Sequence, residues 1–183
     1  MSRLTALLAL VWLCGCGTAK YEVNPDGSRP VLYPADKVLR WEVVDHAYQS
    51  PSGEARIYID STVRFDKDVL LGNGVRIGAG SFIDEDVRLF PNVAIGADTT
   101  VGGDAIVQGD VKIGNKVVIH GDAKIGAGSV VEDGASIGKW VRLGSHVTVG
   151  ANAVIGTGTV VGDGATIKPS QVLPASSRVD AAK

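Results

Sequence analysis

One period runs through most of this 183-residue chain: an apolar residue returns at every sixth position. The series extends from Ile59 to Ile167 through nineteen positions without a change of phase. A second, smaller residue, such as Val75 or Ala105, lies two positions before most of these. Neither the 3.6-residue period of an α-helix nor the two-residue period of a long strand produces a repeat of six. The chain must therefore fold into a structure that itself repeats every six residues.

Glycine, aspartate and asparagine fill many of the positions between the apolar pairs. These residues tolerate left-handed backbone conformations and tight corners. A three-residue strand followed by a three-residue corner, taken three times, closes a triangular coil. Successive coils stack at the strand spacing of about 4.8 Å, so we predict an all-β, single-stranded parallel β-helix of about six coils over residues 57–168.

Three runs make a family resemblance specific: VRIGAGSFI, VKIGNKVVI and AKIGAGSVV. They resemble the hexapeptide repeats of the bacterial transferase hexapeptide superfamily, whose members are trimeric left-handed parallel β-helices. The resemblance covers residues 57–168 and implies a left-handed winding, against the usual preference for right-handed crossovers. It also implies a homotrimer. The tail IKPSQVLPASSRV resembles the end of such a prism, where prolines block the addition of another strand.

The N-terminal residues MSRLTALLALVWLCGCGTAK predict export from the cytosol. The apolar run from Leu4 to Leu13 is too short to span a bilayer, which takes about 20 residues, and matches the core of a signal peptide. LCGC resembles a bacterial lipobox, which implies that Cys16 carries a lipid and anchors the chain to a membrane. Gly17 favours a periplasm-facing lipoprotein of the outer membrane. A plain secretory peptide, cut elsewhere, is the alternative.

These patterns divide the chain into five segments. We expect a signal peptide in residues 1–15, a proline-containing tether in 16–34 and an N-terminal cap segment in 35–56, which contains His46. The β-helix follows in 57–168 and a C-terminal tail in 169–183. Both cysteines lie in the first two segments, so no disulfide is expected within the β-helix.

The outward strand residues fall on three faces of the predicted prism. The first face presents Arg64, Phe82, Thr100, Val118, Ser136 and Val154. The second presents Leu70, Arg88, Ile106, Lys124, Arg142 and Val160. The third presents Tyr58, Arg76, Ala94, Lys112, Val130, Thr148 and Thr166. The first face carries the least charge, and we place a subunit interface there because an exposed apolar stripe favours association.

Aspartates stack at the corner that follows the first face, at Asp68, Asp86, Asp104 and Asp122. Such a column of carboxylates offers oxygen ligands for a calcium ion. The alternative, which we favour, is that each aspartate serves the backbone conformation of its corner and pairs with Arg88 or Lys124. A rise in melting temperature with calcium distinguishes the two.

Two histidines in the repeats are the candidate catalytic residues, His120 and His146. They fall on different edges of the prism and cannot share a metal within one chain. The segment IGNKVVIHGDAKIG faintly resembles the last histidine segment of gamma-class carbonic anhydrases, but Asn115 stands where their companion zinc histidine is expected and a third is absent. A zinc site of that kind is not expected.

We therefore expect an exported, lipid-anchored β-helix that acts as a non-catalytic structural or binding module of the cell envelope. A polysaccharide or another envelope protein is the expected partner. The alternative is a hexapeptide-family acyltransferase that acetylates or acylates a hydroxyl or amine, with His120 or His146 as general base. A metalloprotein like the gamma-class carbonic anhydrases ranks below both. A net charge of −2 argues against a nucleic-acid partner. No cofactor is expected, apart from the possible calcium ion.

Overall fold

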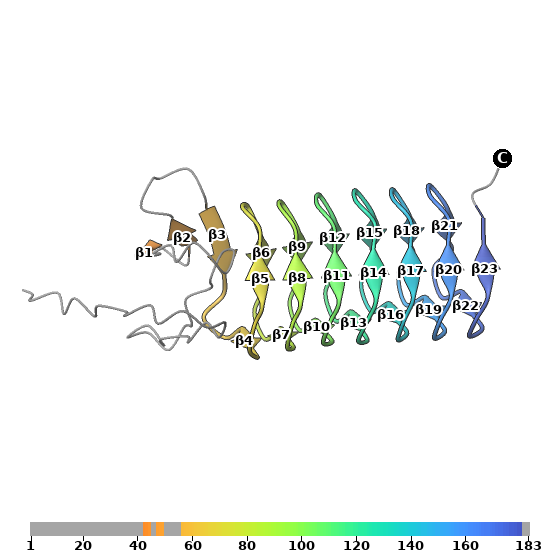
Figure 1. Ribbon diagram of the computed structural model, residues 1–183, viewed down its shortest axis with the longest axis horizontal. Coiled ribbons are helices and arrows are strands. Elements are labelled where there is room, and N and C mark those ends of the chain that lie inside the picture. The colour runs from red at the N-terminus through yellow and green to blue at the C-terminus, as the bar shows by residue number, and fades with distance from the viewer. Residues whose placement is uncertain (1–41, 45–46, 50–55, 181–183) are drawn as a thin grey trace, which may run out of the picture.

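The chain winds into a three-sided prism of short strands (Figure 1). The structure, a computed structural model, describes residues 42–44, 47–49 and 56–180. Strands β3 to β23 form three sheets, and each strand pairs in parallel with the strands one coil before and after it. Each sheet receives seven strands from the prism. The predicted parallel β-helix is confirmed, with about seven coils in place of six.

Each face of the prism is one of these sheets, named as in the sequence. The first face consists of β4 (Arg64–Phe65), β7 (Phe82–Ile83), β10 (Thr100–Val101), β13 (Val118–Ile119), β16 (Ser136–Ile137), β19 (Val154–Ile155) and β22 (Val172–Leu173). The second consists of β5 (Leu70–Leu71), β8 (Arg88–Leu89), β11 (Ile106–Val107), β14 (Lys124–Ile125), β17 (Arg142–Leu143), β20 (Val160–Val161) and β23 (Arg178–Val179). The third consists of β3 (Arg56–Ile59), β6 (Arg76–Ile77), β9 (Ala94–Ile95), β12 (Lys112–Ile113), β15 (Val130–Val131), β18 (Thr148–Val149) and β21 (Thr166–Ile167).

Two further strands extend the third face at its N-terminal end. Strand β1 (Glu42–Val44) pairs antiparallel with β2 (Ala47–Gln49), and β2 pairs antiparallel with β3. The expected cap segment, residues 35–56, thus contributes a β-hairpin to the sheet. Apart from Arg56, which begins β3, the rest of that segment, including His46, lies outside the described residues, as do residues 1–34 with Cys16.

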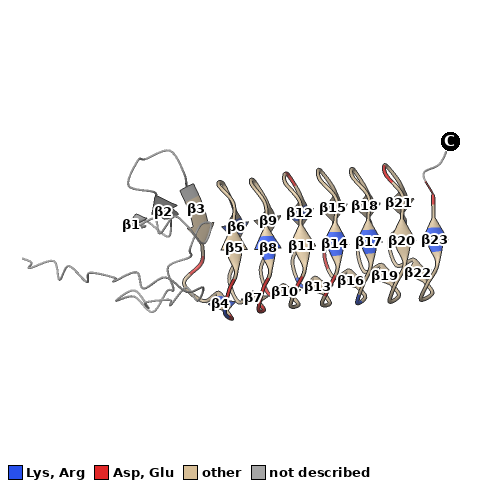
Figure 2. Ribbon diagram, viewed as in Figure 1, with Lys and Arg blue, Asp and Glu red and all other residues tan. Residues whose placement is uncertain are grey.

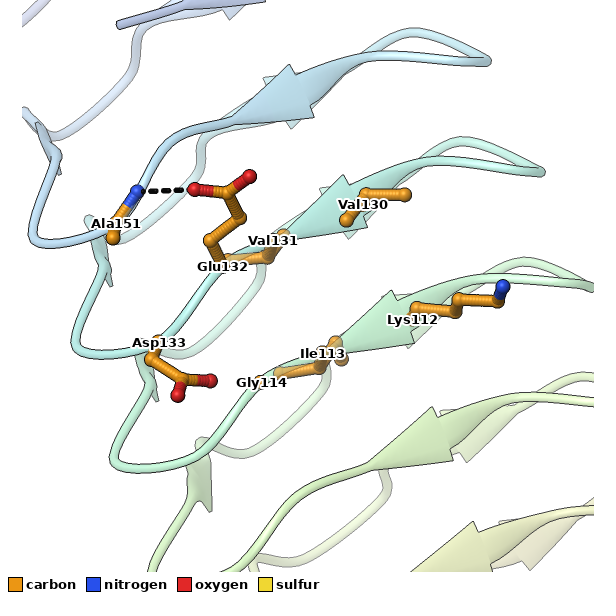
Figure 3. A pocket seen from close by; sticks show the side chains of 8 residues that line it. All are labelled: Lys112, Ile113, Gly114, Val130, Val131, Glu132, Asp133 and Ala151. Carbon is orange, nitrogen blue, oxygen red and sulfur yellow. Dashed lines mark hydrogen bonds between the residues drawn. The ribbon is translucent and has the colours of Figure 1, made fainter. Parts of the chain in front are cut away.

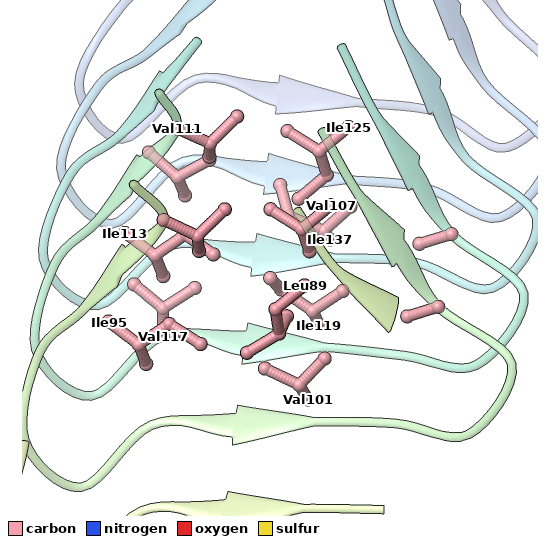
Figure 4. Packing of buried hydrophobic residues seen from close by; sticks show 14 of the residues in the cluster. Leu89, Ile95, Val101, Val107, Val111, Ile113, Val117, Ile119, Ile125 and Ile137 are labelled. Atoms are coloured by element: carbon pink, nitrogen blue, oxygen red, sulfur yellow. The ribbon is translucent and has the colours of Figure 1, made fainter. Parts of the chain in front are cut away.

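The core consists of the residues that recur every sixth position. All nineteen, from Ile59 to Ile167, are buried, and the most exposed of them, Phe65, shows 7% of its surface. Figure 4 shows how side chains from the three faces, such as Ile95, Ile119 and Val107, meet inside the prism. Burial of each Val, Leu or Ile contributes about 1.5–3 kcal/mol. Burial of the side chains at every sixth position is therefore the main contribution to the stability of the fold.

Four buried hydroxyl groups fit this apolar interior because each has a hydrogen-bond partner on the backbone or on another hydroxyl. They belong to Ser81, Thr99, Ser129 and Thr159. The Ser81 hydroxyl donates to the Gly96 carbonyl at 2.8 Å and accepts from the Thr99 amide at 3.1 Å. The Thr99 hydroxyl repeats this pattern with the next coil. Small polar residues at the second inward position therefore tie neighbouring coils together.

From residue 68 onward, the third residue of every corner has its backbone in the left-handed region of φ and ψ. These residues recur every sixth position from Asp68 to Ser176, with φ between 55° and 73°. Thirteen of the nineteen are not glycine. Aspartate and asparagine reach this conformation more readily than most residues, because their short side chains can hydrogen-bond locally. The corner geometry therefore explains the many aspartates and asparagines that punctuate the repeats.

The corners line up along three edges, each named for the face that it follows. The first edge comprises residues 66–68, 84–86, 102–104, 120–122, 138–140, 156–158 and 174–176. The second edge comprises 72–74, 90–92, 108–110, 126–128, 144–146 and 162–164. The third edge comprises 60–62, 78–80, 96–98, 114–116, 132–134, 150–152 and 168–170. The outward residues of the faces stack in the register expected from the sequence, as in the pairs Val118 with Ser136 and Lys124 with Arg142.

The prism extends beyond its expected end at residue 168. Strands β22 and β23 complete another coil, so the predicted tail of residues 169–183 starts too early. Strand amides donate to the following coil, and the part of the chain that the structure describes ends with the coil that contains β22 and β23. Pro174 has no amide hydrogen, and the Lys168 amide donates to the Gln171 side chain at 2.9 Å. These residues remove two donors from an exposed sheet end, as expected of prolines at such a position.

Candidate functional site

The corner between β13 and β14 on the first edge carries His120, which is exposed. Asp122 ends the same corner with φ 59°. In the next coil, the Lys139 ammonium lies 3.4 Å from the Asp122 carboxylate and 4.7 Å from the centre of the Trp140 ring. Two neighbouring corners thus bring an imidazole, a carboxylate, an ammonium and an indole onto one stretch of the first edge. We call His120, Asp122, Lys139 and Trp140 the first-edge cluster.

Trp140 is the unusual member of this cluster. Its side chain is 57% exposed and its backbone φ is 57°, although the left-handed region is unfavourable for a bulky residue. The equivalent residue one coil later is Gly158, which adds no side chain beside the indole. Trp140 was not among the candidate residues predicted from the sequence. The available signal was a tryptophan at a position that elsewhere on this edge is Asp, Gly or Ser.

The exposed apolar residues of the first face adjoin this cluster. Val118, Val154 and Val172 expose 38%, 41% and 66% of their surfaces. They lie on β13, β19 and β22, and Ser136 on β16 lies between the first two. Trp140 follows β16 at the edge. The C-terminal half of the first face and the first edge therefore form one surface that combines apolar residues with titratable ones.

His146 lies elsewhere, on the second edge between β17 and β18. It is exposed, and its backbone φ is 57°. Within the described part of the chain, no group of three or more His, Cys, Asp or Glu side chains could hold a metal ion. The two histidines are on different edges, as expected from the sequence.

Asn115, which stands where a carbonic anhydrase-like zinc site needs a histidine, belongs to a ladder of corner hydrogen bonds. Its side-chain oxygen accepts from the Ala97 amide at 2.8 Å. Its own backbone amide donates to the Asp133 carboxylate at 2.7 Å. Asn115 thus links three successive coils of the third edge. The residues present do not fit a zinc site of that kind.

The aspartate column stacks along the first edge as expected. The backbone amide of Asp104 donates to Glu85, and that of Asp122 donates to Gly103, in the preceding coils. All four aspartates have φ between 55° and 59°, which is the corner conformation itself. The expected pairs with Arg88 and Lys124 are not among the ion pairs of residues 56–180, and Asp122 pairs with Lys139 instead. Calcium binding by the column stays a prediction without structural support.

The N-terminal part of the first edge carries a separate ion pair. The Lys67 ammonium lies 2.9 Å from the Glu85 carboxylate. The hydrogen bond and the charge of Glu85 raise the pKa of Lys67 above its ordinary value. Both side chains are largely exposed, so this pair has a small effect on stability.

Two open hollows lie side by side on the third face and third edge, away from both histidines. The first has a volume of about 440 Å³, and Figure 3 shows Lys112, Val130 and Glu132 among its lining residues. The Glu132 carboxylate accepts from the Ala151 amide at 2.9 Å, and the Asp133 carboxylate accepts from Asn115. The second, of about 420 Å³, shares Asp133 and Ala151 with the first. Their carboxylates hold corners together, and no histidine faces them.

The described residues contain no helix that is long and apolar enough to cross a membrane. Lipid attachment at Cys16 depends on residues outside this part of the chain. The membrane location predicted from the leader therefore stays a prediction.

Comparison with protein families identifies transferase-type repeats. Residues 116–151 match the family described as bacterial transferase hexapeptide (six repeats). Residues 140–168 match the hexapeptide repeat of succinyl-transferase. A search of curated proteins finds no match. The chain thus carries hexapeptide repeats of the transferase kind over β13 to β21.

Solved structures with similar folds include several acyl-transferring proteins. A Bacillus cereus protein assigned to the acetyltransferases aligns with a TM-score of 0.53 and 21% identity, over 65% of this chain and 73% of its own. Perosamine N-acetyltransferase of Caulobacter crescentus aligns with a TM-score of 0.45 and 24% identity, over 67% and 55%. UDP-N-acetylglucosamine O-acyltransferase of Moraxella catarrhalis aligns with a TM-score of 0.47 and 16% identity, over 60% and 64%. The chain spans less than two thirds of the last two. The first alignment supports the β-helix fold.

Proposed function

We propose that this protein is an acyltransferase that transfers an acyl group from a thioester to a hydroxyl or amine, with His120 as general base. One observation carries the proposal: the match to the bacterial transferase hexapeptide family covers residues 116–151, which contain both candidate histidines. This function was the alternative in the sequence analysis, and the comparisons support it better than a non-catalytic module.

The first-edge cluster suits general-base catalysis by His120. An exposed imidazole can take the proton of an acceptor O–H or N–H as the acceptor atom attacks the thioester carbonyl carbon. The tetrahedral intermediate then collapses, the carbon–sulfur bond breaks, and the leaving thiolate recovers the proton from the imidazolium. The next corner of the same edge adds the exposed indole of Trp140 and the positive charge of Lys139. The corner of His146 and the next corner on the second edge, residues 162–164, carry no ammonium or indole group, which makes His146 the second choice.

A trimer would enclose this site. Members of the hexapeptide superfamily are commonly trimeric, and the first face has the composition of a subunit interface. Its C-terminal half exposes Val118, Val154 and Val172 next to Trp140, and exposed tryptophans commonly contribute much of the binding energy of an interface. Packing of a second copy against this half would exclude water from His120 and supply the other wall of a cleft.

The test measures release of free thiol from acetyl-coenzyme A by the full chain, with a panel of amino and hydroxyl sugars as acceptors. His120→Ala should lower the rate by about 10²- to 10⁴-fold, the usual contribution of a general base. The matched control, His146→Ala, should keep most of the rate, because it removes an imidazole of similar exposure from another edge. Thiol release that survives His120→Ala, or that is lost only in His146→Ala, contradicts the assignment.

A second function rests on different observations. The leader predicts a lipid-anchored envelope protein, and the coils run from β3 to β23 with corners of uniform length and no inserted loop that could cover a substrate. Acyl-coenzyme A is a cytosolic thioester, so a chain held at the periplasmic side would not meet it. A structural or binding module of the cell envelope is the function that this location favours.

Metabolic labelling distinguishes the two functions. A palmitate analogue should label the wild-type chain and not Cys16→Ala if the lipobox is used, and fractionation should then place the protein in the envelope. Label with no thiol release favours the envelope module. A cytosolic, unlabelled chain that releases thiol favours acyl transfer and contradicts the leader assignment.

A further inference from the structure

The charges of the prism are separated between its faces and its edges. The outward position that recurs every sixth residue from Tyr58 to Arg178 never holds an aspartate or glutamate, whereas it holds arginine or lysine seven times. The carboxylates of the same region all lie at corners. Figure 2 shows basic residues on strands such as β8, β14, β17 and β23 and most of the acidic ones on the connections. The net charge of −2 for the whole chain therefore conceals faces with no negative charge of their own.

The second face holds most of these strand cations. Its outward residues, in order along the prism, are Leu70, Arg88, Ile106, Lys124, Arg142, Val160 and Arg178. We call Arg88, Lys124, Arg142 and Arg178 the second-face cations. They form one row across six neighbouring strands, which at about 4.8 Å per strand is about 24 Å long. The first and third faces hold three such cations between them, at Arg64, Arg76 and Lys112.

Most of the second-face cations have no carboxylate partner. The ion pairs of residues 56–180 join Lys67 to Glu85, Lys139 to Asp122 and Arg178 to Asp180. The other three second-face cations form no ion pair with a described residue and are exposed. By contrast, Arg64 and Arg76 each lie over an aromatic ring, at 5.8 and 4.9 Å from its centre. The row on the second face thus presents positive charge that the chain itself leaves available.

The spacing within the row indicates what kind of anion fits. Aliphatic side chains lie between cations at Ile106 and Val160, so two of the three intervals are two strands wide, about 10 Å. In a polymer with closely spaced negative charges, some of those charges would lie opposite the aliphatic side chains of Ile106 and Val160. A polymer whose carboxylates are separated by the apolar surfaces of sugar rings matches both kinds of residue.

We propose that the second face binds a linear acidic polysaccharide that lies along the prism. Its carboxylates pair with the second-face cations, three of which are arginines that can hold a carboxylate with two parallel hydrogen bonds. The C–H surfaces of its sugar rings contact Ile106 and Val160. The binding involves a different surface from the first-edge cluster and does not depend on acyl transfer.

The test measures binding of fluorescein-labelled polygalacturonate to the full chain by fluorescence anisotropy, at low and then at rising salt. Wild type should bind and should lose affinity as salt increases, because exposed ion pairs are screened. The triple variant Arg88→Gln, Lys124→Gln, Arg142→Gln should weaken binding by about tenfold or more. The matched control Arg64→Gln, Arg76→Gln, Lys112→Gln removes the same charge from the other two faces and should change binding less than about twofold.

Four outcomes overturn the proposal. They are the absence of polygalacturonate binding by folded wild type, equal losses in the two triple variants, tighter binding of long-chain polyphosphate than of polygalacturonate, and binding confined to phosphatidylglycerol vesicles. Circular dichroism of both variants establishes that each keeps its β structure. Because thiol release is not measured, failure of this proposal leaves the acyltransferase proposal intact, and the converse also holds.

Discussion

The first and second faces have the same backbone and different surfaces. Both are seven-stranded parallel sheets with buried aliphatic residues on their inner side. Outside, the C-terminal half of the first face exposes valines, whereas the second face presents a row of cations. The difference arises from one outward side chain per strand, at positions that contribute little to the core. The fold and the surface chemistry of this prism can therefore change independently, and function has to be sought at the outward and corner positions.

The largest effect is expected for core substitutions, which test whether the two faces pack against one common core. Ile119 and Ile125 point inward from β13 and β14 and are 0% and 1% exposed. Either one replaced by alanine should lower the free energy of unfolding by about 2–5 kcal/mol, through lost burial and the cavity that remains. Urea denaturation measures both variants. Similar losses support a common core, and a loss confined to one face would show that the faces differ inside as well.

The next effect concerns association, and it should separate the faces. Val154→Glu places a carboxylate in the proposed interface of the first face, where an unpaired buried charge costs several kcal/mol. We expect the dissociation constant of the proposed trimer to rise at least about a hundredfold. Val160→Glu makes the same change one strand further along the chain, on the second face, and should leave the trimer intact. Sedimentation velocity distinguishes the two, and a Val154→Glu protein that remains trimeric argues against an interface on this face.

A smaller effect on stability is expected from relieving backbone strain at the corners that join the faces. Lys116 is exposed and has φ 56°, a conformation that costs a residue other than glycine about 1 kcal/mol. Lys116→Gly should therefore stabilise the protein by about 1 kcal/mol. Lys112→Gly, in the adjoining strand β12, should destabilise it by about 0.5–1 kcal/mol. Thermal melts compare them, and a shift of the same sign in both variants would rule out backbone strain as the cause.

The smallest effect lies on the first edge, between the two faces. The raised pKa of Lys67 means that its pair with Glu85 stabilises the fold below the pKa of the unfolded lysine and that this contribution disappears as pH rises through the folded pKa. Glu85→Gln should therefore differ slightly from wild type at neutral pH and converge with it at strongly alkaline pH. Denaturation midpoints over this range measure the convergence. A difference that persists at the alkaline end would point to a contact other than the ion pair.

The period of six was sufficient to predict the core, the faces and their register, because burial selects the same kind of residue at every inward position. The C-terminal coil was missed for a physical reason. Gln171 and Ser177 replace the usual Val or Ala at the second inward positions, and Pro169 and Pro174 flank β22, so the sequence resembles a tail although Leu173 continues the period.

The candidate site was harder to predict than the fold. Aspartate at a corner satisfies the left-handed backbone and also resembles a metal ligand, so the column from Asp68 to Asp122 was ambiguous in the sequence. The role of Trp140 depends on its exposure and on the neighbouring Lys139, which lie beyond what a repeat pattern specifies. In this repeat, residues that suit the corner conformation and residues that could bind a ligand occupy the same positions, so the sequence alone does not distinguish them.

The closing of the last coil has a consequence for assembly. Each end of a parallel β-helix presents backbone groups that pair with another coil in the interior, with strand amides as the donors at the C-terminal end, and such unpaired groups allow identical units to join head to tail. Pro174 and Gln171 remove donors from that end, whereas the apolar half of the first face remains available. A second copy stacked end to end on this coil would therefore find fewer backbone donors there than an interior coil offers.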